Sequence, residues 1–188
     1  MTENKPTYIY RLENAGDVKV AIVRSLFNEV VTSRLETGAV EGLLAGGIEK
    51  ENISFFPVPG AMEIPLAVQL AFEGGADAAV AVGCVIRGET THYEAVCNSA
   101  ERGCMDVQLK FSRPVGFGVI MTEDKEQAAQ RSGGRHGNKG FEAAQAAIRI
   151  LQIKRELSNN NKESITNNLD NNYSLPREFY GEPSNYGE

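Results

Sequence analysis

The chain has 188 residues, with 19 Lys or Arg against 25 Asp or Glu, so its formal net charge is −6 at pH 7. Hydrophobic residues make up 41% of it, which is typical of a globular chain with one sizeable core. The acidic balance argues against a general nucleic-acid-binding protein, which needs a basic surface. No segment approaches the roughly 20 apolar residues of a membrane span, and the polar start (MTENKPTY) is unlike a signal peptide. We therefore expect a cytoplasmic protein with neither nucleic-acid nor membrane partners.

Four short segments rich in Val, Ile and Phe are predicted to be strands: 18–23, 53–56, 78–85 and 115–120. Helical spacing of apolar residues predicts helices over 31–44, 93–111 and 141–151, and shorter helices after Pro65 and around 127–131. Nearly continuous apolar strands that alternate with helices indicate a parallel sheet covered on both faces. We therefore predict a three-layer, flavodoxin-like α/β domain with a four-stranded parallel sheet. Residues 7–12 are predicted to add an edge strand to this sheet or to a neighbour's.

The α/β domain is predicted to span residues 1–157, and residues 158–188 form an Asn-rich acidic tail. The tail carries two basic and five acidic residues, so its charge of −3 is half of the total. Neither helical nor strand periodicity continues into it, which predicts a flexible segment.

In an open parallel sheet, ligands bind beyond the carboxyl ends of the strands, where the strand order reverses. Phe27 and Asn28 follow the first strand, and the Phe27 ring is suited either to stacking on a planar ligand or to stapling the next helix. The second strand leads into PVPGAMEIP, where Glu63 offers a carboxylate either to ligand hydroxyl groups or to the positive end of a helix.

The third strand leads into GCVIRGETTHYEAV, which has the composition of an anion site at a helix N-terminus. Thr91 and Glu94 match a capping box, so a helix is predicted to begin near His92. A histidine there is either a proton-transfer group or an ordinary surface residue. Cys84 is the one plausible thiol nucleophile, although a small buried residue is the favoured interpretation.

A glycine-rich basic loop (SGGRHGNKG) follows the fourth strand and its short helix. Arg131, Arg135 and Lys139 concentrate positive charge there, which indicates phosphate or carboxylate recognition, with a plain linker as the alternative. The three cysteines lack CxxC spacing and only two histidines are present, so we expect no metal site. Together these features predict a small-molecule site with a phosphate subsite and a histidine.

Five blocks in this order, SLFNEVVT, PVPGAMEIP, GCVIRGETTHYEAV, GFGVIMTED and GGRHGNKGFEAA, resemble the lumazine synthase family from about Val18 to Leu157. The resemblance implies riboflavin biosynthesis without a cofactor: 5-amino-6-ribitylaminouracil and 3,4-dihydroxy-2-butanone 4-phosphate give 6,7-dimethyl-8-ribityllumazine, phosphate and water. A non-catalytic flavin- or lumazine-binding protein, or a shell protein, on the same scaffold remains the alternative.

The resemblance also implies roles for individual residues. The pyrimidine substrate would contact a set that stacks on its ring, holds its ribityl chain and pairs with its uracil edge: Phe27, Asn28, Ala61, Met62, Glu63, Cys84, Val85 and Ile86. Glu89 and Thr90 would bind phosphate together with Arg131, and His92 would move protons. A neighbouring subunit would supply Phe117, Arg131, Lys139 and Glu142.

Members of the family form pentamers, some of which assemble into 60-subunit icosahedral capsids. The short loop Gly133–Gly140 resembles that of the capsid members, which favours the 60-mer here. Riboflavin synthase is a further partner that the resemblance raises.

Overall fold

The computed structural model describes residues 8–172, and their side chains as far as residue 160. Four parallel strands form the central sheet, in the spatial order β2-β1-β3-β4. They are β1 (Val20–Ser25), β2 (Ile53–Val58), β3 (Ala78–Ile86) and β4 (Val115–Thr122). All four predicted strands are confirmed, and each one extends one or two residues further toward the ligand-binding edge than the sequence predicted.

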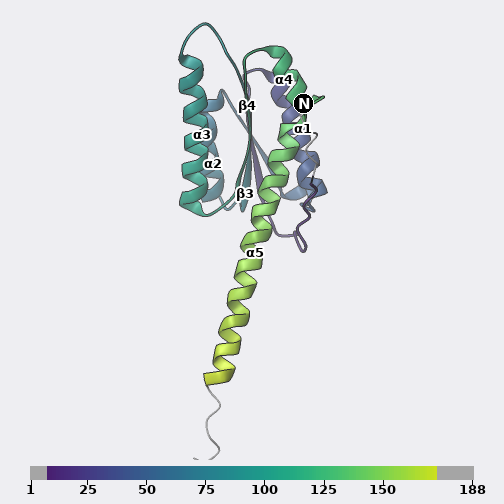
Figure 1. The fold of residues 1–188 in the computed structure, drawn as a ribbon, viewed down its shortest axis with the longest axis vertical. Helices are drawn as coiled ribbons and strands as arrows, with labels where there is room; N and C mark the ends of the chain where they lie inside the picture. The colour runs from purple at the N-terminus through teal and green to yellow at the C-terminus, as the bar shows by residue number, and fades with distance from the viewer. Residues whose placement is uncertain (1–7, 173–188) are drawn as a thin grey trace, which may run out of the picture. The chain divides into compact units, whose positions relative to one another are not determined.

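Five helices pack against the sheet, as the sequence analysis also predicted. They are α1 (Glu29–Ala45), α2 (Ile64–Glu73), α3 (His92–Phe111), α4 (Lys125–Arg131) and α5 (Lys139–Asn172). Short 3-10 turns, η1 (Lys50–Asn52) and η2 (Ala61–Glu63), precede β2 and α2. Figure 1 shows α2 and α3 on one face of the sheet and α1, α4 and the first part of α5 on the other.

The alternation of side chains along the strands divides the core into two layers. Ile22, Val80 and Val82 pack against the helices on the α1 and α5 face. Ala79 and Ala81 pack against the α2 and α3 face. Both sets are fully buried, so the central strands are apolar on both sides, which is why their sequences read as continuous apolar runs.

The glycine-rich segment before α5 is a hairpin rather than a plain linker. Its strands β5 (Ser132–Gly134) and β6 (Gly137–Asn138) are antiparallel, with Gly133 and Gly137 at positive φ. Asn138 Oδ1 accepts from the Gly140 N–H at 2.9 Å, and Asn138 Nδ2 donates to the Arg34 carbonyl of α1 at 2.8 Å. Asn138 therefore caps α5 and joins it to α1.

The first described residues do not form a strand, so the edge strand predicted within this sheet is wrong for residues 8–12. The Leu12 N–H donates to the Gly46 carbonyl at 2.8 Å, and Gln152 Nε2 donates to the Arg11 carbonyl at 2.8 Å. These bonds hold the segment against the α1–α5 layer, where no strand is available for pairing. Thr7 lies outside the described residues, and pairing with a neighbour's sheet stays a prediction.

The chain divides into two compact units after Gln152. The first holds the sheet and its helices, and the second begins at Ile153 within α5 and is helical as far as Asn172. The helix thus continues beyond the boundary predicted after residue 157. The flexibility predicted for the tail stays a prediction. Among the helices that the structure describes, none is long and apolar enough to cross a membrane.

Candidate active site

A cavity of about 380 Å³ opens at the carboxyl ends of β1, β2 and β3. The strand order reverses between β1 and β3, so the cavity lies where an open parallel sheet binds its ligands. The structure brings together nine of the predicted site residues in its wall: Phe27, residues 61–63 and 84–86, Thr90 and His92.

The turn after β1 is tied to the end of β3. Asn28 lies in the left-handed region at φ 59° and ψ 46°, at the N-terminus of α1. Its side-chain Nδ2 donates to the Cys84 carbonyl at 3.0 Å. Phe27, the preceding residue, is 71% exposed and extends along the cavity wall. Asn28 itself is not in that wall, so it acts on the cavity by fixing the position of this turn.

The loop after β2 is held by Glu63, whose Oε2 accepts from the Gly60 N–H at 2.8 Å. This bond closes the turn η2, and Pro65 then occupies the first turn of α2. Ala61 is buried, while Met62 is about half exposed. Glu63 therefore lines the cavity with one carboxylate oxygen bonded to the loop. This position is compatible with both predicted roles, binding of ligand hydroxyl groups and stabilisation of the helix start.

The end of β3 presents backbone to the cavity, because its two neighbouring strands stop at different levels. The ladder with β1 ends at the pair Arg24–Val82, whereas the ladder with β4 continues to Ile86–Thr122. Within the described sheet, the β1-facing edge of residues 84–86 has no strand partner. Polar groups of a planar ligand can pair with that edge.

Helix α3 begins at His92, as predicted, but the predicted capping box is wrong. Thr91 makes no side-chain cap bond, and the Glu94 carboxylate pairs with Arg87 instead. Thr90 Oγ1 accepts from the His92 N–H at 3.4 Å, which is a long bond. Apart from this long bond, no side-chain cap is described for the helix start, which lies beside the cavity as an anion-binding helix end would.

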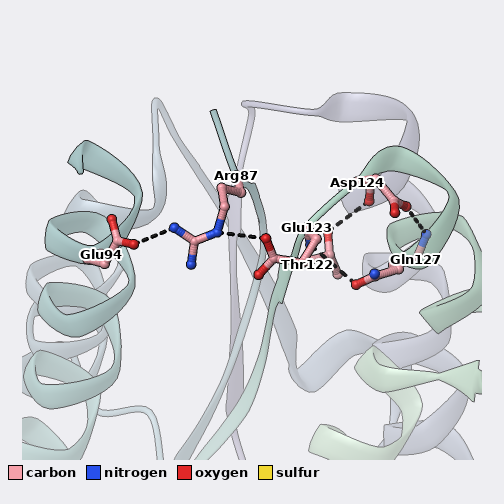
Figure 2. Close-up of polar contacts among 6 residues, drawn as sticks. All are labelled: Arg87, Glu94, Thr122, Glu123, Asp124 and Gln127. Carbon is pink, nitrogen blue, oxygen red and sulfur yellow. Dashed lines mark hydrogen bonds and ion pairs between the residues drawn. The ribbon is translucent and has the colours of Figure 1, made fainter. Parts of the chain in front are cut away.

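Arg87 joins three elements beside this helix start (Figure 2). It pairs with Glu94 of α3, and its Nε donates to Glu123 Oε2, just after β4, at 2.7 Å. Its guanidinium carbon lies 4.1 Å from the centre of the Tyr93 ring. The bond to Arg87 lowers the pKa of Glu94, and the bond to Glu94 is the main cause that raises the pKa of Arg87.

Burial raises the pKa of the Cys84 thiol to about 11, so this side chain stays neutral at physiological pH. A neutral thiol is a poor nucleophile, which supports its interpretation as a small buried residue. Among the side chains that the structure describes, residues 8–160, no group of three His, Cys, Asp or Glu converges as metal ligands would.

Five further predicted residues do not line the cavity: Glu89, Phe117, Arg131, Lys139 and Glu142. Lys139 pairs with Glu142 at 2.6 Å, and Arg131 Nη1 donates to the Gln127 carbonyl at 3.1 Å. Within the described chain, no Lys or Arg side chain lines the cavity. A single chain therefore does not bring the predicted basic residues to the helix N-terminus.

Four residues of the cavity wall were not predicted as site residues: Gly60, Gly88, Tyr93 and Val96. The signal for the two glycines is their place inside the motifs that follow β2 and β3, PVPGAMEIP and GCVIRGETTHYEAV. Tyr93 and Val96 follow the helical spacing of core residues, and spacing alone does not separate a core face from a cavity wall.

The sequence of this chain matches known proteins over most of its length. The family model described as 6,7-dimethyl-8-ribityllumazine synthase matches residues 17–155. A 6,7-dimethyl-8-ribityllumazine synthase of Bdellovibrio bacteriovorus is 46% identical over 144 residues, 76% of this chain and 78% of that protein. That of Cytophaga hutchinsonii is 46% identical over 150 residues, 79% of this chain and 94% of that protein. That of Pediococcus pentosaceus is 41% identical over 158 residues, 84% of this chain and 98% of that protein. The chain belongs to the 6,7-dimethyl-8-ribityllumazine synthase family.

Proposed function

We propose that this chain catalyses the condensation of 5-amino-6-ribitylaminouracil with 3,4-dihydroxy-2-butanone 4-phosphate. The amine attacks the ketone and forms an imine with loss of water, phosphate is then eliminated, and ring closure with loss of water gives 6,7-dimethyl-8-ribityllumazine. The observation that carries this proposal is the cavity at the sheet reversal, which combines an exposed aromatic ring, a strand edge without a strand partner and a histidine at a helix start. Family membership and the motif order support the same reaction.

The pyrimidine substrate occupies the β1 and β3 side of the cavity. Phe27 stacks on its ring, since an exposed aromatic side chain beside a cavity suits a planar heterocycle. The uracil edge pairs with the backbone of residues 84–86, whose β1-facing edge has no strand partner, although the Cys84 carbonyl already accepts from Asn28 Nδ2. The ribityl hydroxyls lie along residues 61–63, where Glu63 keeps one carboxylate oxygen that its bond to Gly60 does not use.

The phosphate-bearing substrate occupies the N-terminal end of α3. The N–H groups of the first turn, the Thr90 hydroxyl and the adjacent backbone of Glu89 bind the phosphate. Glu89 is absent from the cavity wall, so its carboxylate does not add negative charge to that wall. His92 lines the cavity in the first turn and moves protons during imine formation and phosphate loss.

A neighbouring subunit completes each site. An anionic substrate needs a cation, and within the described chain no Lys or Arg lines the cavity. We therefore place Phe117, Arg131, Lys139 and Glu142 in the next subunit's cavity, with Arg131 on the phosphate. This arrangement requires a ring such as a pentamer. The short loop Gly133–Gly140, here a hairpin, favours assembly of such rings into a 60-subunit shell in the cytoplasm, with riboflavin synthase as a further partner.

Turnover by the purified protein tests the reaction. Both substrates are mixed with the protein, lumazine is followed by its fluorescence, and released phosphate is measured in the same samples. We expect lumazine and phosphate to appear together, well above the uncatalysed rate. Tight binding of the pyrimidine or of lumazine without turnover would instead identify a binding protein, and assembly without either would identify a shell protein.

A further inference from the structure

We infer that Arg87 is a positioning residue that holds the helix-entry loop (Gly88–Thr91) and His92 in place for the phosphate-bearing substrate. The inference rests on the proposed function, because it assigns the role of a residue beside that same site. Arg87 is absent from the cavity wall, whereas Gly88, Thr90 and His92 all line it. We therefore expect Arg87 to act on the reaction through the loop rather than by contact with the substrate.

The guanidinium of Arg87 joins the two ends of the helix-entry loop. Its backbone N–H donates to the Thr122 carbonyl at 2.9 Å, which fixes the residue at the end of the β3–β4 ladder. Its side chain pairs with Glu94, in the first turn of α3, and with Glu123 at 2.7 Å. Figure 2 shows the guanidinium between the two carboxylates. One side chain thus sets the separation between the end of β3 and the start of α3.

The loop itself has little else to hold it. Gly88 to Thr91 are all exposed, and a Cβ at Gly88 would meet no atom within 4 Å. The polar contacts described for the loop are two long bonds of 3.4 Å, one from the His92 N–H to Thr90 Oγ1 and one from the Ala95 N–H to the Thr91 carbonyl. Ordering a loose loop at the moment of binding costs free energy, so a clamp that orders it beforehand favours binding.

The arrangement also has the features that distinguish a clamp from an ordinary surface ion pair. Isolated pairs on a surface contribute little, but Arg87 makes two ion pairs and lies over the Tyr93 ring, 4.1 Å from its centre. The planar guanidinium serves all three partners at once, which a lysine does not reproduce. Further hydrogen bonds connect Glu123 to the start of α4. Gln127 Oε1 accepts from the Glu123 N–H at 3.2 Å, and Asp124 Oδ1 accepts from the Gln127 N–H at 2.7 Å.

Three variants of the full chain test the role: Arg87→Gln, Glu94→Gln and the double variant. Arg102→Gln is the matched control, because it removes the same charge from an exposed residue of α3 for which no ion pair is described. Steady-state kinetics give the KM of each substrate separately. Hydrogen exchange of the peptide covering residues 88–94, without substrate, reports the order of the loop independently of activity.

We expect each single variant to raise the KM of the butanone phosphate about tenfold and that of the pyrimidine by less than about twofold. The KM of the butanone phosphate in the double variant should be no higher than in the more impaired single variant, because both substitutions break the same ion pair. Exchange over residues 88–94 should rise in all three variants and stay unchanged in Arg102→Gln. A fourth variant, Arg87→Lys, should retain only part of the affinity for the butanone phosphate, since lysine keeps the positive charge but lacks the planar guanidinium.

The opposite result for Glu94→Gln would overturn the inference. If the Arg87 guanidinium bound phosphate itself, removal of its carboxylate partner would lower the KM of the butanone phosphate. Unchanged exchange together with unchanged KM values in Arg87→Gln would also overturn it. Absence of lumazine formation by the unaltered protein would contradict the proposed function instead, and the exchange measurement would still decide whether Arg87 orders the loop.

Discussion

Replacement of Asn28 tests the tie between the β1 turn and the end of β3. Asn28→Ala removes the donor of the 3.0 Å bond to the Cys84 carbonyl, and an uncharged hydrogen bond contributes about 1 kcal/mol. It also replaces Asn, which tolerates the left-handed region better than other side-chain-bearing residues, with Ala at φ 59°, at a further cost of about 1 kcal/mol. We therefore expect the free energy of unfolding to fall by about 2 kcal/mol.

Urea unfolding followed by circular dichroism, at equal subunit concentrations, measures this loss. Asn28→Gly is the comparison, because glycine adopts positive φ freely and loses the hydrogen bond alone in the folded state. It should lose about 1 kcal/mol, less than the alanine variant. The reasoning is refuted if Asn28→Ala unfolds at the same urea concentration as the unaltered protein, or if the glycine variant is the less stable of the two.

Two further predictions concern packing and thiol ionisation. A Cβ at Gly140 would lie 1.9 Å from the Leu35 carbonyl oxygen, so Gly140→Ala should destabilise the domain by about 2 kcal/mol in urea unfolding, despite the better helix propensity of alanine. Gly16→Ala, whose nearest contact is an ordinary 3.6 Å, is the control, and equal stability of the two variants would contradict the packing argument. Burial raises the pKa of Cys84 from 9.0 to about 11 and that of Cys104 to about 12. Their contribution to stability is therefore complete below pH 9.0 and is lost as the pH rises through the folded values, because the unfolded chain ionises first. The loss of stability between pH 9 and 11 should therefore be smaller in a variant with both cysteines changed to Ala. Cys84 should also resist alkylation by iodoacetamide at pH 7, and rapid alkylation there would contradict the burial argument.

Most of the sheet was predictable because its strands are short and consist largely of apolar residues, many of them β-branched. β3 shows this most clearly, since burial on both faces makes residues 78–85 a continuous apolar run. The strand ends were less predictable: the final residues of β1 and β4, Ser25 and Thr122, are polar yet buried. Hydrogen bonding to neighbouring strands extends these strands where the side-chain pattern has already stopped.

The candidate site was predictable where the motif itself forms the wall and unpredictable where contacts cross between elements. His92 was found because it follows a glycine and two threonines at a helix start. The pairing of Glu94 with Arg87 was missed because a local capping box explained Glu94 equally well from sequence. The bond from Asn28 to Cys84 spans 56 residues, and nothing in either motif indicates it.

Mixed assemblies test most directly the central claim that one lumazine-forming site is built from two subunits. Phe27→Ala/His92→Ala chains, impaired in the cavity, are co-expressed with Arg131→Ala chains, impaired in the cation, and the mixed assemblies are assayed for lumazine formation. If Arg131 serves the neighbouring cavity, about one site in four regains a full set of side chains, and activity rises well above that of either variant alone. Activity equal to the average of the two variants would show that each chain holds its own complete site, and would contradict the account.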